Sequence, residues 1–122
     1  MKSTSLEARF AEIEAEHLAV AQFNEVVSAL EALYSAALGQ RAVQDLALPI
    51  RVREFLSTED GGRELERWSL YFGERVRSML AIQGQLVINP HVAIPELNRL
   101  TQSVSEILGA FEASIVSLIE AR

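Results

Sequence analysis

Residues 97–118, LNRLTQSVSEILGAFEASIVSL, decide the fold because apolar side chains recur there at steps of three and four. The stripe consists of Leu97, Leu100, Val104, Ile107, Phe111, Ile115 and Leu118. These steps average about 3.5 residues, the period at which one face of an α-helix stays against a partner helix. An apolar face of this kind has to be buried, so the stretch predicts that helix packs on helix.

The same spacing recurs along the chain and predicts two more long helices. We expect the first helix over residues 5–38, with Gly39 supplying the left-handed residue that commonly ends a helix. Its stripe is Leu6, Phe10, Ile13, His17, Val20, Phe23, Val27, Leu30, Tyr34 and Leu38. The other two long helices are expected over residues 61–87 and 95–121.

The middle of the chain is interrupted by Pro49, which cannot lie deep inside a helix and pushes Leu48 toward extended backbone. We therefore expect two short helices, over residues 40–47 and 49–57. A strand over residues 46–52 is the alternative, and the sequence offers it no obvious partner strand.

Two turns are predicted at the ends of the third helix. Ser57 and Asp60 have the spacing of a capping box, and Gly61 and Gly62 give the chain conformational freedom to turn. A loop is expected over residues 89–95, and the proline that ends it suits the first position of the last helix.

Length and composition limit the fold and the chemistry. The 122 residues form one domain by length, and 49% hydrophobic with 23% charged residues is typical of a globular protein. We predict an all-α, antiparallel four-helix-type bundle over residues 1–122, with a long first helix and a proline-broken second segment. The chain has no cysteine, which excludes disulfides, thiolate metal sites and cysteine nucleophiles. It has no apolar leader and no uninterrupted membrane-length apolar run, so we expect a cytoplasmic protein without membrane insertion.

The helix lengths predict a homodimer. The first helix would be roughly 50 Å long against roughly 37–40 Å for the third and fourth, so its apolar stripe would project beyond them. Exposed apolar strips usually mark contacts, and a second copy would cover this one. The alternative is that the broken second segment folds back over the excess length.

An arginine-rich region is the predicted surface for a protein partner. Its residues are Arg51, Arg53, Arg63, Arg67, Tyr71 and Arg75. Arginine and exposed aromatic side chains are enriched at binding hot spots, whereas Trp68 and Phe72 lie on an apolar stripe and are expected in the core. Acids alternate with these arginines and the net charge is −6, so we expect nucleic acid to be repelled.

Glu14 and His17 define the alternative function. They stand three residues apart, the spacing with which helical bundles hold two metal ions. His91 lacks a glutamate three residues before it, so one chain has only one such pair, and a metal site would require two copies, with Glu64 or Glu66 as further ligands. His17 is otherwise expected in the core, and His91 in an exposed loop.

No G-x-S-x-G, P-loop or dinucleotide-binding motif is present, and the only lysine is Lys2. The sequence therefore favours a non-catalytic intracellular protein without a cofactor. We expect it to homodimerise and to bind a protein as an adaptor, chaperone or inhibitor. The alternatives are a metal- or small-ligand-binding bundle, with enzymatic activity as an option, and an RNA-binding accessory subunit.

Overall fold

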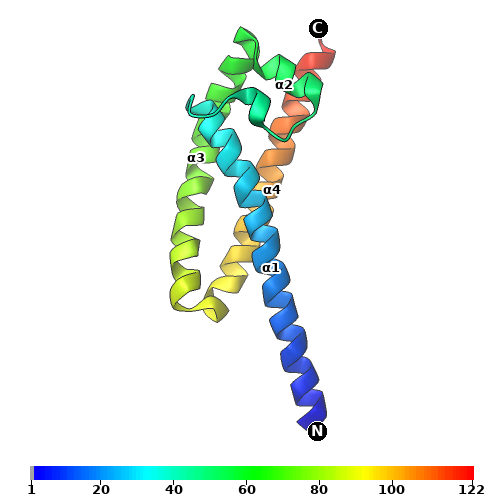
Figure 1. The fold of residues 1–122 in the computed structure, drawn as a ribbon, viewed down its shortest axis with the longest axis vertical. Helices are drawn as coiled ribbons and strands as arrows, with labels where there is room; N and C mark the ends of the chain where they lie inside the picture. The colour runs from blue at the N-terminus through cyan, green and yellow to red at the C-terminus, as the bar shows by residue number, and fades with distance from the viewer. Residues whose placement is uncertain (1) are drawn as a thin grey trace.

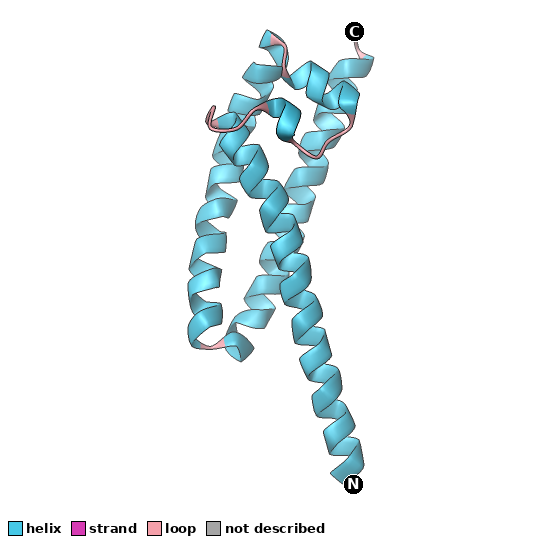
Figure 2. Cartoon of the chain, in the orientation of Figure 1, coloured by secondary structure: helices cyan, strands magenta, loops and turns pink. Residues whose placement is uncertain are grey.

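The computed structural model describes residues 2–122, and it describes the side chains of residues 6–89 and 93–122. The helices are α1 (Lys2–Ala37), α2 (Ile50–Leu56), α3 (Glu59–Ile88) and α4 (Pro90–Glu120), with a short 3-10 turn, η1 (Val43–Asp45), between the first two. No strand lies within residues 2–122 (Figure 2), so the all-α prediction is confirmed and the strand alternative is wrong.

The three long helices pack on one another and form the body of the molecule. Figure 1 shows α3 running opposite to both α1 and α4, and α2 lying across the end at which the chain terminates. The antiparallel four-helix-type arrangement is not confirmed, because the fourth segment supplies only the seven residues of α2.

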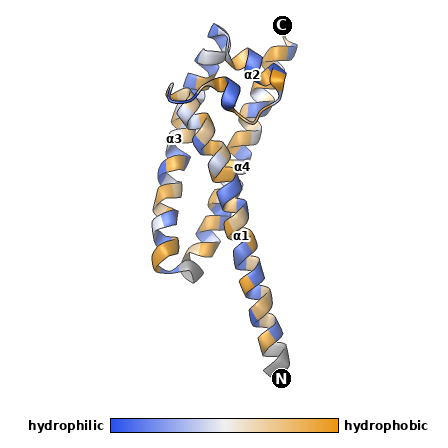
Figure 3. Cartoon of the chain, in the orientation of Figure 1, coloured by the Kyte–Doolittle hydropathy of each residue, from blue (hydrophilic) through white to orange (hydrophobic). Residues whose placement is uncertain are grey.

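Two apolar clusters hold the body together, and each draws on α1, α3 and α4. The cluster beside α2 has Leu30, Leu33, Ala36, Leu46, Val52, Phe55, Leu56, Leu65, Phe72, Val104, Phe111 and Ile115 at its centre. The cluster beside the α3–α4 turn has Ala19, Phe23, Val27, Met79, Ile82 and Leu97. These apolar positions alternate with polar ones along each helix, as the banding in Figure 3 shows.

The N-terminal part of α1 extends beyond the bundle that covers the rest of the helix. Ala19 is its first buried residue, and all but one of the described side chains before it are exposed. We call residues 6–18 the overhang; in Figure 1 it projects past the α3–α4 turn. The prediction of a long first helix is confirmed, and α2 lies at the opposite end of the molecule, so the second segment does not cover the overhang.

The connection between α3 and α4 is a single residue, Asn89, and the predicted loop over residues 89–95 is wrong. Pro90 takes the first helical position instead, where its missing N–H costs nothing. Pro95 lies inside α4, where its ring nitrogen cannot donate a helical hydrogen bond. The predicted exposed-loop side chain of His91 lies outside the described residues.

The middle segment is less helical than predicted. The helix expected over residues 40–47 is only the three-residue turn η1, whereas the one expected over 49–57 is α2, with Pro49 as its N-cap. Gly39 follows Leu38, the first residue after α1, and adopts a φ of +76°, which confirms its predicted role in ending the helix.

The start of α3 differs from the predicted turn. Thr58, not Ser57, caps the helix by accepting a hydrogen bond from the Gly61 N–H at 3.1 Å. Gly61 is buried within the first turn of α3, and a Cβ there would lie 1.9 Å from the Phe55 carbonyl oxygen. This glycine is therefore needed for the close approach of α2 to α3 and not for a turn.

The length and composition of α4 have a property that was not predicted from the sequence. Over Ala93–Glu120 it is long and apolar enough, by length and composition alone, to cross a membrane. Helices in the cores of water-soluble proteins share this property, and α4 buries Leu97, Val104, Phe111 and Ile115 against its neighbours.

Candidate protein-interaction surfaces

The overhang carries an exposed apolar strip on an isolated helix. The side chains of Leu6, Phe10 and Ile13 are 55%, 57% and 46% exposed. They are linked to the buried Phe23 by steps of three and four residues, but at about 100° per residue these steps leave Phe10 about 140° from Phe23 around the helix axis. The strip therefore continues the apolar sequence pattern of α1 but lies on a different side of the helix from the buried face.

His17 and Glu14 both lie exposed on the overhang. The expectation that His17 is a core residue is wrong, because the bundle begins to cover α1 only at Ala19. Within one chain, no three His, Cys, Asp or Glu side chains among the described residues lie close enough to hold a metal ion.

Part of the predicted arginine-rich region is brought together at the end of the molecule where α2 meets the end of α4. Arg63 and Arg67 line a hollow of about 410 Å³ with Phe55 and Arg122, and Arg51 borders the adjoining hollow beside the same two residues. We call these residues, Arg51, Phe55, Arg63, Arg67 and Arg122, the arginine surface.

Each arginine of this surface has an acidic neighbour. Arg63 and Arg122 both reach Asp60, at 2.8 and 3.0 Å. Arg67 lies 3.0 Å from Glu64, and Arg51 lies 3.8 Å from Glu120. The surface is thus a mosaic of both charges, which fits a protein partner better than a phosphate backbone.

The structure places the other predicted residues elsewhere. Arg53 donates from Nη1 to the Gln44 carbonyl oxygen at 2.9 Å and so ties α2 to the preceding connection. Arg75 is largely buried and donates from Nη1 to the Tyr71 carbonyl oxygen at 3.3 Å. Arg53 therefore links two segments of the chain, whereas the contacts of Arg75 stay within α3.

The aromatic side chains divide between core and surface much as predicted. Phe72 is fully buried, and Trp68 is half-buried with its ring centroid 5.6 Å from that of Phe111. Tyr71 is 51% exposed and packs its ring beside Trp68 at 5.7 Å. The exposed position predicted for Tyr71 is confirmed, although it lies on α3 beyond the arginine surface.

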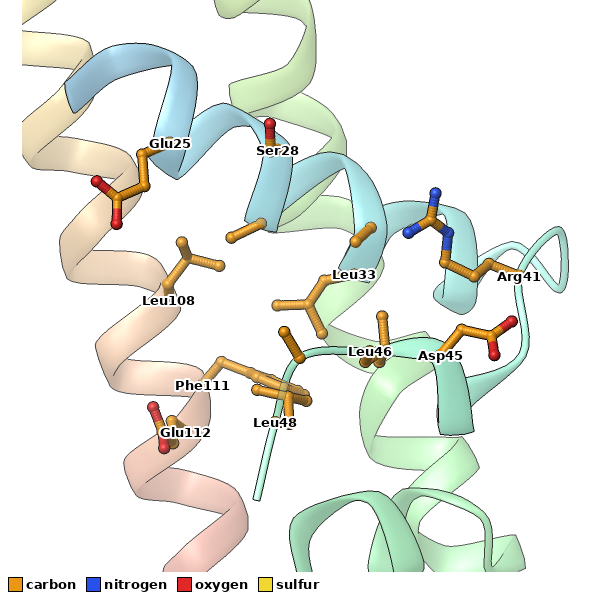
Figure 4. A pocket seen from close by; sticks show the side chains of 13 residues that line it. Glu25, Ser28, Leu33, Arg41, Asp45, Leu46, Leu48, Leu108, Phe111 and Glu112 are labelled. Carbon is orange, nitrogen blue, oxygen red and sulfur yellow. The ribbon is translucent and has the colours of Figure 1, made fainter. Parts of the chain in front are cut away.

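A groove of about 490 Å³ lies between α1, α4 and the segment that joins α1 to α2. Leu33, Leu48 and Leu108 point into it, and charged groups stand at its rim (Figure 4). This groove was not predicted, because no sequence pattern shows that residues 40–48 lie beside α1.

Sequence reasoning also missed Arg122 and the exposed end of α3. Arg122 lies 62 residues from Asp60 in the chain, so only the fold reveals their contact. Val87 and Ile88 are each 86% exposed. The two consecutive apolar residues at the end of a predicted helix could have indicated this exposed patch, which is separate from the strip on the overhang.

The chain matches no protein-family model, and comparisons with curated proteins and with solved structures find no significant match. Function is therefore inferred from the residues of this chain.

Proposed function

We propose that this protein is a non-catalytic helical adaptor of the cytoplasm that homodimerises through the overhang and binds a protein partner through the arginine surface. The observation that carries the proposal is the exposed apolar strip of the overhang, with Leu6, Phe10 and Ile13 on one helix face. An apolar strip that projects past its own bundle stays in water, whereas a partner helix would bury it.

The arginine surface supplies the second half of the proposal. It combines the ring of Phe55, over which the Arg122 guanidinium lies at 4.8 Å, with three further arginines on α2 and α3. Arginines that already lie beside carboxylates can exchange those neighbours for charges on a partner. The free-energy cost of removing water from the arginines is then partly compensated. Because both charges are present, this surface favours a polar protein over nucleic acid.

The dimer is tested by light scattering on a sizing column across a range of protein concentrations. We expect a mass of about 27 kDa, twice the 13.5 kDa of the chain. Phe10→Glu combined with Ile13→Glu should reduce the mass to that of one chain, because it places charge on the strip. Ala8→Glu combined with Ala15→Glu is the matched control, since it adds the same charge on the opposite face of α1. A single-chain mass for the unmodified protein at every concentration would refute the dimer.

The partner surface is tested by charge reversal at Arg67, whose side chain is 73% exposed. Arg67→Glu should weaken capture of a protein partner and leave the thermal unfolding midpoint almost unchanged. Arg77→Glu, an exposed position on the same helix outside the arginine surface, is the control. Equal capture by both variants, or unfolding of Arg67→Glu, would remove this surface from the proposal.

A further inference from the structure

We infer that the groove between α1, α4 and residues 38–49, the connection between α1 and α2, binds a small amphipathic cation. Such a ligand has an apolar body and carries one ammonium or guanidinium group. The residues that line the groove belong neither to the overhang nor to the arginine surface, so the inference does not rest on the function proposed above. It follows from the shape of the groove, from its apolar walls and from the charged side chains at its rim.

The face of α1 that borders the groove carries short side chains. Glu25, Ser28, Ala29 and Ala32 follow steps of three and four residues, so they share one side of the helix. At positions 28, 29 and 32 only a methyl or hydroxymethyl group separates the α1 backbone from the groove. This side of α1 therefore leaves room for a molecule beside it.

The floor of the groove is apolar and belongs to the core. Leu33, Leu46 and Phe111 come from α1, the connection and α4, and all three are buried. Leu48 and Leu108 are half-buried and complete the walls. Figure 4 shows leucine side chains from all three segments directed into the same space. An apolar ligand would remove this surface from water, which favours its binding.

The groove is closed on three sides, which favours a compact ligand over a peptide helix. In Figure 4, α1, α4 and the connection each form one side. The volume of about 490 Å³ lies within the range of sites that hold small molecules. A peptide helix of several turns, which is about 10–12 Å wide, would meet the connection at one end of the groove.

Hydrogen bonds hold the connection in place, so the groove exists before a ligand binds. Arg53 on α2 donates from Nη1 to the Gln44 carbonyl oxygen at 2.9 Å, and Gln44 donates from Nε2 to Ser57 Oγ at 3.1 Å. The buried side chain of Leu46 anchors the same segment in the core. A preformed site loses little conformational entropy when it binds a ligand.

The rim of the groove carries charged side chains without partners in the described part of the chain. Glu25, Asp45 and Glu112 line the groove together with Arg41. Within residues 6–89 and 93–122, the side chains of these four residues form no ion pair. The arginines of the arginine surface, by contrast, all have acidic neighbours. The rim charges are therefore free to pair with a ligand.

These rim charges are divided between the two ends of the groove. Glu25 on α1 and Glu112 on α4 lie toward the end beside α4, with Leu108 between them in Figure 4. Arg41 and Asp45 lie at the other end, where their opposite charges offset each other. Among the described lining residues, the end beside α4 therefore presents two carboxylates and no cation.

This arrangement defines the chemistry of the ligand. An ammonium or guanidinium group complements the two carboxylates, and an apolar body complements the leucine walls. The net charge of −6 also attracts cations and repels anions. An amphiphile with a carboxylate has a suitable body but the wrong charge, so it should bind least.

The ligand class is tested with three probes that share one apolar body: phenylbutylamine, phenylbutanol and phenylbutyrate. Chemical-shift changes of the backbone amides of the full chain measure the affinity and locate the site. The amine should bind tightest and the carboxylate weakest, with shifts centred on residues 25–33, 41–48 and 108–112. Equal binding of amine and alcohol would overturn the requirement for a cation. Shifts centred elsewhere, or no saturable shift with any probe, would overturn the site.

Substitution at the rim separates the effect of charge from that of packing. Glu25→Gln combined with Glu112→Gln should weaken amine binding by about two- to fivefold for each carboxylate removed and leave alcohol binding unchanged. Glu31→Gln combined with Glu106→Gln is the matched control, since these exposed glutamates lie on the same two helices outside the groove. An equal loss in both double variants would show that only the overall charge attracts the amine, and would overturn the role of the rim.

A larger side chain in the groove tests the cavity itself. Ala29→Phe changes an exposed position of α1, so the chain should still fold while its new ring fills the groove and abolishes binding of the amine and the alcohol. Ala21→Phe, at an exposed position of α1 outside the groove, should leave binding intact. Undiminished binding to a folded Ala29→Phe variant would overturn the site. Binding of a lysine-rich amphipathic peptide at these residues, without binding of phenylbutylamine, would assign the groove to a protein and overturn the small ligand.

Discussion

The two halves of α1 share one pattern of apolar three- and four-residue steps in two different environments. Residues 19–37 are pressed against α3 and α4, and the side chain of Phe23 is completely buried. Residues 6–18 project past the α3–α4 turn, and Phe10, which belongs to the same pattern of steps, is 57% exposed. A periodic stripe therefore shows that a helix face requires cover, but not whether the cover comes from the same chain.

Truncation of the two phenylalanines is the strongest test of this difference. Phe23→Ala should lower the free energy of unfolding by about 3–5 kcal/mol, because it leaves a cavity among buried side chains. Phe10→Ala should lower it by less than about 1 kcal/mol when protein is dilute enough to be monomeric. Denaturant titration at low concentration measures both values. Equal losses would show that the overhang packs against its own bundle.

The stability of the buried half of α1 also depends on α2, which packs closely against α3 at the end of the bundle opposite the overhang. Gly61→Ala should cost about 2–3 kcal/mol of unfolding free energy, because the new Cβ would overlap backbone atoms of Phe55 and Leu56. Gly62→Ala is the matched control, since nothing lies within 4 Å of its Cβ position. That variant should be more stable by about 0.5–1 kcal/mol, because alanine favours the helix. Similar melting curves for both variants would contradict the close contact of α2 with α3.

Removal of residues 1–17 separates the two environments directly. The remaining chain keeps both apolar clusters, so its unfolding free energy as a monomer should change by less than about 1 kcal/mol. Its mass should be that of one chain at every concentration. Loss of cooperative unfolding in the truncated chain would show that the overhang contributes to the fold.

The smallest effect is expected at exposed charges. Arg67→Ala removes a pair with Glu64 in which the arginine side chain is 73% exposed, so stability should change by less than about 0.5 kcal/mol. Thermal unfolding of this variant beside the unmodified protein measures the difference. A loss approaching that of Phe23→Ala would mean that Arg67 supports the fold and is not free for a partner.

Long-range periodicity was predictable from sequence, and local backbone geometry was only partly so. The three long helices were expected because their stripes extend over many turns, and the structure confirms them. The interval over residues 40–47 carries too short a pattern to distinguish a helix from the 3-10 turn that forms. Pro90 was read as part of a loop and Pro95 as the first residue of the last helix, yet both lie within α4.

The candidate surfaces were predictable to a different extent. The overhang was predicted from the helix lengths, because a longer helix must extend beyond shorter neighbours. The arginine-rich region was resolved only by the fold, which gathers Arg51, Arg63 and Arg67 and takes Arg53 and Arg75 into contacts with carbonyl oxygens. Side chains on different helices meet according to the rotation of each helix, and sequence spacing within one helix does not specify that rotation.

The single-residue connection at Asn89 has a consequence for the order in which the chain folds. α3 and α4 are adjacent in sequence and close a very short loop, so their pairing should form early. α1 leaves the ribosome first but must wait several seconds until α4 is synthesised, at ordinary rates of about 5–20 residues per second. During that interval its whole stripe is uncovered, and contact between neighbouring nascent chains could begin along α1 before either bundle has closed.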